Sequence, residues 1–307
     1  MEVFDSIVVG SGPAGLTAAL YLSRFGVRVA LVEKLSSGGM LLQTSEIENY
    51  PGFSHVKGYE LADAMQGQLG LYQLTRYQGE VSVFEYSPGH NRLKVGEEWI
   101  VGKTVVISAG LRFRKLGLAD EERLTGRGVS YCALCDGPFY RGQIVGVAGG
   151  GNAALEEALY LASIAKELHL FHRRDQFRAD KVYRDKVLAT PNITVHYNSV
   201  ITQLHGKDGL ESVSINVGPH GEIQRLPLNG LFVFIGQIPS AEFLPSTLEV
   251  DEEGFIITDT EMRTNLHGVF AAGDIRSKLC KQVATAVGDG ATAANSAYSY
   301  LEKTNAI

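Results

Sequence analysis

The order of hydrophobic and polar positions repeats in two parts of this chain. Residues 6–9 form a short apolar run that predicts a buried strand, and residues 14–25 then predict a helix with few polar positions. A glycine-rich turn separates these two segments. Residues 144–148 and 153–165 predict a second strand and helix around a second glycine-rich turn. The pattern indicates an α/β protein that contains two similar units.

The two glycine-rich turns are the first candidates for a binding site. They read Gly10-Ser11-Gly12-Pro13-Ala14-Gly15 and Gly149-Gly150-Gly151-Asn152-Ala153-Ala154. Such a turn between a strand and a helix directs backbone N–H groups and the helix N-terminus at a dinucleotide pyrophosphate. The alternative is a turn that merely packs strand on helix. We expect two Rossmann-like nucleotide-binding domains, with contacts from Gly10, Gly12, Pro13, Ala14 and Gly15 and from Gly149, Gly151, Asn152 and Ala153.

The residue expected beside the ribose differs between the two units. Glu33 lies 23 positions after Gly10, and a carboxylate there accepts ribose hydroxyl groups and repels a 2′-phosphate. The same offset from Gly149 leads to a basic cluster of His172, Arg173, Arg174 and Arg178. Cations suit a 2′-phosphate, although Asp175 and Asp180 dilute the cluster and a solvated strand end is the alternative. We expect FAD in the first site and NADPH in the second.

A pair of cysteines, Cys132 and Cys135, lies shortly before the second glycine turn. A zinc site needs about four ligands, and the chain has no second C-x-x-C. A thioredoxin-type motif needs a helix that continues, yet Gly137-Pro138 follows almost at once. Inert buried thiols are the remaining alternative. Between two nucleotide turns, a redox-active disulfide is the interpretation we favour.

Asp136 directly follows this pair. A carboxylate beside a thiol raises the pKa of the thiol, so it does not stabilise a thiolate. Its useful role would be proton transfer to and from a thiol during exchange. The alternative is an ordinary helix cap or turn aspartate.

Composition adds limits to this interpretation. The chain has 307 residues, enough for two domains, and its net charge of −6 gives no electrostatic case for nucleic acid or an anionic membrane. We expect neither a signal peptide nor a membrane span. Three cysteines do not make a disulfide-stapled secreted scaffold, so we expect a cytoplasmic protein. No metal site is expected, and Cys280 is expected to be a small buried residue.

Several segments together resemble the bacterial low-molecular-weight thioredoxin reductases. They are residues 126–181, 10–15, 38–52 and 268–274, with Gln282 and 288–290. The combination of C-x-x-C-D with H-R-R-x-x-x-R is the most specific part, and the resemblance extends over nearly the whole chain. It implies electron transfer from NADPH to FAD, then to the Cys132–Cys135 disulfide, and finally to the disulfide of thioredoxin or a thioredoxin-like protein.

The resemblance also implies a domain layout and further site residues. A discontinuous FAD domain would comprise residues 1–113 and 243–307, with an NADPH domain, 114–242, inserted into it. Cys135 would face the flavin, Cys132 would attack the substrate disulfide, and the protein would be a homodimer. The further FAD contacts implied are Gly39, Met40, Gln43, Asn49, Asp274, Lys281, Gln282 and Val283.

Four positions depart from the commonest pattern of this family. Met40 replaces a glutamine, Leu134 a threonine, Ala153 a residue with a hydroxyl, and Lys281 an arginine. None of these changes removes a catalytic atom. Two alternatives stay open: the same disulfide chemistry with another donor, such as reduced ferredoxin or NADH, and a redox-sensing flavoprotein that binds a partner without turnover.

Overall fold

The computed structural model describes residues 2–44, 46–218 and 221–304 and divides the chain into two compact units. Unit 1 comprises Met1–Arg112 and Ile238–Ile307, and unit 2 comprises Phe113–Gln237. The chain passes between them on two paired strands, β7 (Leu111–Phe113) and β16 (Gln237–Pro239). The boundaries expected from the sequence, after residues 113 and 242, lie one and five residues further along. The second boundary differs more because the chain returns to unit 1 on β16, which pairs with β7 and so places the crossing at residues 237–239.

Unit 1 contains a seven-stranded mixed sheet in the order β3-β2-β1-β6-β5-β4, with β17 also paired to β6. The long strand β6 pairs in parallel with β1, antiparallel with β5 near its start, and in parallel with β17 near its end. The sheet therefore branches at β6. The strands are β1 (Val3–Val9), β2 (Val29–Glu33), β3 (Thr75–Gln78), β4 (Val81–Glu85), β5 (Asn91–Val95), β6 (Glu98–Ile107) and β17 (Val269–Ala271).

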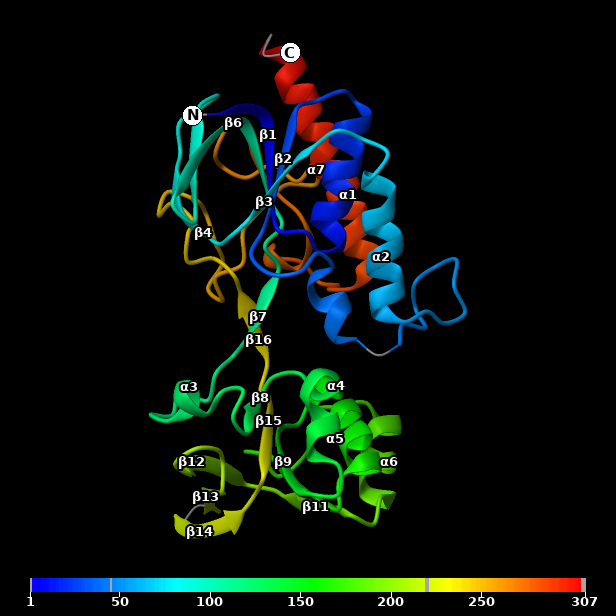
Figure 1. The fold of residues 1–307 in the computed structure, drawn as a ribbon, viewed down its shortest axis with the longest axis vertical. Helices are drawn as coiled ribbons and strands as arrows, with labels where there is room; N and C mark the ends of the chain where they lie inside the picture. Colours follow the sequence, from blue (N-terminus) through cyan, green and yellow to red (C-terminus); the bar gives the residue numbers. More distant parts are fainter. Residues whose placement is uncertain (1, 45, 219–220, 305–307) are drawn as a thin grey trace. The chain divides into compact units, whose positions relative to one another are not determined.

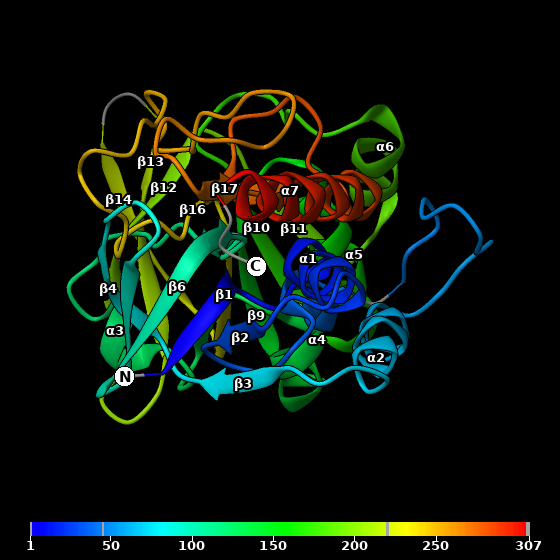
Figure 2. The same cartoon turned by 90° about the horizontal axis from the view of Figure 1, so that it is seen from above.

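The helices of unit 1 gather on one face of this sheet (Figure 1). They are α1 (Pro13–Arg24), α2 (Gly58–Leu69) and α7 (Val283–Lys303), with the short 3₁₀ helices η1 (Gly39–Gln43) and η3 (Gly273–Ile275). Figure 2 shows α1 beside α7. The two helices approach closely because Gly290 of α7 has no side chain, and a Cβ there would lie 2.2 Å from the Ala14 carbonyl oxygen.

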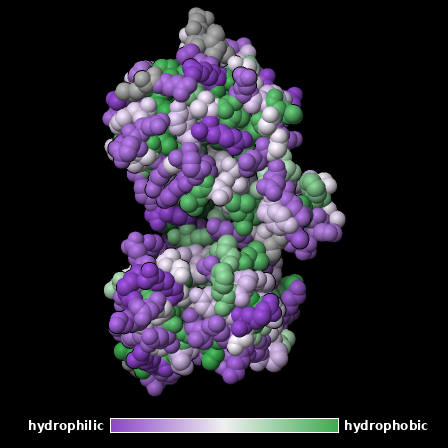
Figure 3. Space-filling view, in the orientation of Figure 1, coloured by the Kyte–Doolittle hydropathy of each residue, from purple (hydrophilic) through white to green (hydrophobic). Residues whose placement is uncertain are grey.

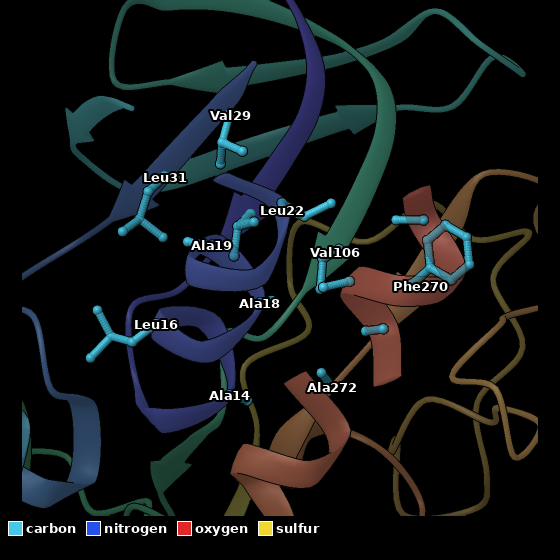
Figure 4. Packing of buried hydrophobic residues seen from close by; sticks show 14 of the residues in the cluster. Ala14, Leu16, Ala18, Ala19, Leu22, Val29, Leu31, Val106, Phe270 and Ala272 are labelled. Atoms are coloured by element: carbon cyan, nitrogen blue, oxygen red, sulfur yellow. The ribbon is translucent and has the colours of Figure 1, made fainter. Parts of the chain in front are cut away.

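The core of unit 1 lies between α1 and the parallel strands. Figure 4 shows the apolar side chains of α1, including Leu22, packed near Val29 and Leu31 of β2 and Val106 of β6. These strands carry apolar residues on both faces, which is typical of parallel strands covered on both sides. A second cluster, with Phe4 and Ile7, fills the other face. The first glycine turn thus begins at the end of a strand that is buried on both faces.

Unit 2 repeats this design with a five-stranded parallel sheet in the order β11-β10-β9-β15-β8. A separate antiparallel sheet, β12-β13-β14, packs nearby. The strands are β8 (Val129–Ser130), β9 (Ile144–Gly149), β10 (Glu167–Phe171), β11 (Ile193–His196), β12 (Ser199–His205), β13 (Ser212–Val217), β14 (Glu222–Pro227) and β15 (Gly230–Phe234). The helical segments are α3 (Glu121–Leu124), α4 (Ala133–Asp136), η2 (Gly137–Tyr140), α5 (Asn152–Ile164) and α6 (Lys181–Ala189).

Both units share the strand order of a Rossmann-like domain. In unit 1 the path β3-β2-β1-β6 matches β11-β10-β9-β15 in unit 2, and β1 and β9 each lead through a glycine turn into a helix. The predicted α/β fold class is confirmed. Polar residues cover most of the visible face of each unit (Figure 3). Within the described parts of the chain, no helix is long and apolar enough to span a bilayer.

Candidate functional site

Two of the three glycines in the first glycine turn have no room for a side chain, and the third faces open space. Gly10 has φ +95°, a left-handed conformation that favours glycine, and a Cβ there would lie 2.4 Å from the Ser108 carbonyl oxygen. A Cβ on Gly15 would lie 1.8 Å from the Gly10 carbonyl oxygen. Gly12 differs, because the nearest atom to its Cβ position is 4.0 Å away. The open space beside Gly12, next to Pro13 at the start of α1, is where a pyrophosphate would lie.

Glu33, the last residue of β2, reaches back to this turn. Its Oε2 accepts hydrogen bonds from the backbone N–H and the hydroxyl of Ser11, both at 2.8 Å. Its Oε1 accepts a hydrogen bond from the Leu35 N–H at 2.9 Å. The carboxylate therefore holds the turn in place at the position expected to bind a ribose.

The 3₁₀ helix η1 brings further predicted residues to the same turn. A Cβ on Gly39 would lie 3.1 Å from the Cα of Gly12, so two residues without side chains face each other. Met40 is partly buried. The side-chain oxygen of Gln43 is buried and has no hydrogen-bond partner within the described residues. A buried amide oxygen without a partner suits a polar ligand group.

The start of α7 gathers the predicted residues from the C-terminal part of unit 1. The amide nitrogen of Asn49 donates a hydrogen bond to Oε1 of Gln282 at 3.1 Å, directly before Val283, the first residue of α7. Lys281 lies over the ring of Phe255, with its Nζ 3.0 Å from the ring centroid, and burial lowers the pKa of this amine. The α7 N-terminus and its partial positive charge thus lie beside Asn49 and Gln282.

Asp274 belongs to a buried charge cluster that the sequence analysis did not identify. Its Oδ1 is buried and lies 3.2 Å from Lys278 Nζ, but it accepts no hydrogen bond within the described residues. Lys278 Nζ is also 3.0 Å from Asp289, which pairs with Arg276 at 2.8 Å. The Gly273 N–H donates to Asp289 at 3.1 Å. A buried aspartate in the alanine-rich helix α7 is the signal that could have revealed this cluster.

The second glycine turn follows β9 in unit 2. A Cβ on Gly149 would lie 2.5 Å from both the Ala154 Cβ and the Phe234 carbonyl oxygen, so this position has no room for a side chain. Gly151 has no atom within 4 Å of its Cβ position, and Ala153 is exposed. Asn152 is already bonded to Asp180, whose N–H donates to its side-chain oxygen at 2.7 Å. The open side of this turn is therefore at Gly151.

The predicted basic cluster divides into one buried and three exposed residues. His172 is buried beneath the glycine turn, 5 % exposed. The guanidinium groups of Arg173, Arg174 and Arg178 are exposed, and within the described residues none of them pairs with a carboxylate. These three remain the candidates for a direct phosphate contact. The role predicted for His172 as a ligand stays a prediction, and its position suggests an indirect contribution.

Cys132 and Cys135 form a disulfide in the structure. Cys135 is exposed, and its backbone N–H donates to the Cys132 sulfur at 3.2 Å. The helix α4 ends at Asp136, because Gly137-Pro138 continue as the 3₁₀ helix η2. Asp136 makes no capping hydrogen bond, and its charge contributes to the raised pKa of Tyr140 after the larger effect of burial. The carboxylate beside the disulfide is therefore not used as a helix cap.

A buried carboxylate supports the residue before the disulfide. Glu121 is 2 % exposed and accepts hydrogen bonds from the N–H groups of Leu116 at 2.7 Å and Gly117 at 2.8 Å. It also accepts a hydrogen bond from the Tyr131 hydroxyl. Burial and then this hydrogen bond raise the pKa of Tyr131. The sequence analysis did not identify Glu121, whose Asp-Glu-Glu-Arg surroundings read as a solvated segment.

Three further observations concern a glutamate on α5, the third cysteine and metal ligands. Burial, and secondarily the charge of Glu156, raises the pKa of Glu157 on α5 to about 7. The expectation that Cys280 is buried is wrong, because this free cysteine is exposed in the loop before α7. Across the described residues, no group of three or more His, Cys, Asp or Glu side chains is arranged to hold a metal ion.

Comparison with known proteins agrees with this geometry. The model of the pyridine nucleotide-disulphide oxidoreductase family matches residues 4–290. Thioredoxin reductases of Listeria innocua and Ureaplasma parvum are 37 % and 40 % identical, covering 98 % and 99 % of this chain and 95 % and 99 % of theirs. The crystal structure of Lactococcus lactis thioredoxin reductase (FR conformation) has a TM-score of 0.91 and 38 % identity, covering 98 % of this chain and 99 % of that one. This chain belongs to the pyridine nucleotide-disulphide oxidoreductase family.

Proposed function

We propose that this chain is an FAD-containing thioredoxin reductase that uses NADPH. The observation that carries the proposal is the disulfide Cys132–Cys135, which shares unit 2 with a glycine turn and an exposed arginine cluster. Unit 1 holds a second nucleotide turn. Thioredoxin reductases with similar sequences match this chain over nearly their whole length.

The residues of unit 1 fit FAD. The open space at Gly12 suits a pyrophosphate, and the carboxylate of Glu33 suits a ribose without a 2′-phosphate. Among the described residues, the buried oxygens Gln43 Oε1 and Asp274 Oδ1 accept no hydrogen bond, although Asp274 lies beside Lys278, and both suit hydroxyl or N–H groups of a ligand. The other residues that would hold FAD are Gly10, Pro13, Ala14, Gly15, Gly39, Met40, Asn49, Lys281, Gln282 and Val283.

The residues of unit 2 fit NADPH. Gly151 leaves open space for a pyrophosphate at the start of α5. Exposed guanidinium groups on Arg173, Arg174 and Arg178 suit a 2′-phosphate, which only NADPH carries. The remaining proposed residues are Gly149, Asn152, Ala153 and His172.

When bound, NADPH and FAD supply the two electrons that open the Cys132–Cys135 disulfide, and two protons complete the thiols. The Cys132 thiolate then attacks one sulfur of the partner's disulfide and forms a mixed disulfide. Cys135 attacks the Cys132 sulfur, releases the partner as a dithiol and restores the starting disulfide. Asp136 directly follows Cys135 and would take and return the thiol proton.

We also propose that the enzyme acts as a homodimer in the cytoplasm, with thioredoxin or a thioredoxin-like protein as its partner. The resemblance to bacterial thioredoxin reductases supports the dimer. The cytosol is a compartment in which thioredoxin keeps protein thiols reduced, and a reductase that returns thioredoxin to its dithiol form suits it. Light scattering after size-exclusion chromatography measures the mass of the assembly directly.

The deciding experiment is turnover of thioredoxin disulfide by the FAD-loaded chain, with NADPH, NADH and reduced ferredoxin compared as donors. We expect NADPH to be preferred and Cys135→Ser to remove turnover while FAD stays bound. Cys280→Ser is the matched control, because this exposed cysteine lies outside the disulfide. Flavin reduction without transfer to any thioredoxin tested would instead favour a sensor, and preference for ferredoxin would replace the donor.

A further inference from the structure

The imidazole of His172 lies between two backbone carbonyl groups. Its Nδ1 is 3.0 Å from the Gly149 oxygen, and its Nε2 is 2.9 Å from the Gln176 oxygen. A carbonyl oxygen can only accept a hydrogen bond, and a neutral imidazole has one N–H to donate. Both contacts are therefore hydrogen bonds only when both ring nitrogens carry a proton.

These two carbonyl groups belong to the two halves of the proposed nucleotide site. Gly149 begins the glycine turn, and Gln176 lies in the segment 173–178, which we call the arginine loop. One more link joins the same parts, because the Arg178 N–H donates to the Gly150 oxygen at 2.9 Å. Two residues after the arginine loop, Asp180 exchanges two hydrogen bonds with Asn152 of the glycine turn. A Cβ on Gly150 would lie 2.2 Å from the His172 ring, so the turn folds directly against the imidazole.

The charges around His172 oppose its protonation while the site holds no anion. Burial is the largest effect that lowers the pKa of His172, and the cations Arg178 and Arg174 lower it further. The carbonyl groups of Gln176 and Gly149 act in the opposite direction. On the side of β11, the backbone oxygen of His196 accepts a hydrogen bond from the backbone N–H of His172, not from its ring. The carboxylate of Asp180, directly before α6, is bonded to Asn152.

We propose that His172 is a positioning residue that ties the arginine loop to the glycine turn, and that binding of NADPH converts it to the imidazolium form. This inference rests on the proposed function, because it assumes a 2′-phosphate beside the arginine loop. Phosphate would neutralise Arg174 and Arg178 and so remove the cations that oppose protonation. Both carbonyl contacts then become hydrogen bonds, and the arginine loop is held at the spacing that a 2′-phosphate requires.

The test measures binding of NADP⁺ and NAD⁺ to the oxidised, FAD-loaded chain by calorimetry at pH 7. Two buffers without phosphate and with different ionisation enthalpies give the number of protons taken up. His172→Gln keeps a hydrogen-bonding side chain but can donate to only one of the two carbonyl groups. His169→Gln is the matched control, because His169 lies on β10, the strand that ends directly before His172, and bonds to His196 instead.

We expect His172→Gln to weaken NADP⁺ binding about tenfold, equivalent to about 1.4 kcal/mol, and NAD⁺ binding less. Wild type should take up more protons on binding NADP⁺ than His172→Gln does, and His169→Gln should match wild type in both respects. Because the phosphate contributes the same protons to both proteins, the difference reports His172. Nitrogen NMR of the His172 ring in wild type, with and without NADP⁺, gives its charge state even if the variant fails to fold.

An unchanged NADP⁺-to-NAD⁺ affinity ratio in folded His172→Gln would overturn the positioning role. A ring that stays neutral with NADP⁺ bound, or equal proton uptake in the two proteins, would overturn the imidazolium. These results differ from a failure of the proposed function, in which wild type itself shows no preference for NADP⁺ over NAD⁺ and the inference falls with it.

Discussion

Alanine at Gly12 should separate the stability of the fold from the affinity for FAD. Gly12 has φ −73° and ψ −175°, which any residue adopts, and its Cβ position has only one neighbour, 4.0 Å away. The new methyl group would enter the space proposed for the pyrophosphate. Gly15→Ala is the contrasting change, because its methyl group would lie 1.8 Å from the Gly10 carbonyl oxygen and must move the backbone.

The two changes should have opposite effects on the free energy of unfolding of the apoprotein. At a compatible conformation, Gly→Ala stabilises by about 0.4–1 kcal/mol, because the unfolded chain loses freedom. Gly12→Ala should do this. Overpacking of a tight contact costs about 1–3 kcal/mol, so Gly15→Ala should destabilise by at least this much. The new methyl group would occupy the space of the pyrophosphate. The Gly12→Ala variant should therefore bind FAD at least about tenfold more weakly than wild type, equivalent to about 1.4 kcal/mol.

Urea unfolding of the FAD-free proteins and titration with FAD measure the two quantities separately. Gly151→Ala is the matched control, because Gly151 has an equally open Cβ position but lies in the other unit. It should leave the FAD affinity unchanged and weaken binding of NADP⁺. FAD affinity that survives Gly12→Ala within a factor of two would refute the assignment of Gly12 to the pyrophosphate site.

Three further predictions concern the charged and redox groups of unit 2. Arg173→Ala with Arg174→Ala should raise the KM for NADPH far more than that for NADH, since each charged contact is worth about 1.5–3 kcal/mol; equal effects would remove the 2′-phosphate assignment. With Cys135→Ser, Cys132 should trap a thioredoxin that lacks its resolving cysteine, as mass spectrometry of the mixed disulfide would show, and trapping through Cys135 in Cys132→Ser would reverse the roles. The pKa of Glu157, raised to about 7, means that the folded chain binds a proton that the unfolded chain releases near pH 4.5, so stability should fall from pH 4.5 to 7. Urea unfolding of Glu157→Gln over this range should lack that component, and parallel curves for the two proteins would contradict the raised pKa.

The sequence predicted those features that follow from local chain geometry. Strand, glycine turn and helix recur at both places because a tight turn without side chains is required at each. The end of α4 followed from Gly137-Pro138, which cannot continue an α-helix. The fold class came from the same local patterns. Such features need only neighbouring residues, so the sequence carries them directly.

Features that depend on distant contacts escaped the sequence analysis. His172 was grouped with the following arginines by charge, although Leu168 and Leu170 share its alternation and face the core. The parity of strand β10 could have revealed its burial. Glu121 gave no such signal, because its hydrogen-bond donors lie in a connection without regular structure. Cys280 was expected in the core on residue type alone, yet even the neighbouring Leu279 is exposed.

The paired crossing strands β7 and β16 make unit 2 an insertion with adjacent ends. The Ser240 N–H donates to the Gly110 oxygen at 3.1 Å, and the Arg114 N–H donates to the Gly236 oxygen at 2.9 Å. This register sets residue 112 opposite residue 238, and paired strands lie about 4.8 Å apart. A short turn could therefore close unit 1 after removal of residues 113–237. The same closeness would let one gene segment encoding the disulfide and its arginine loop be exchanged between relatives as a single module.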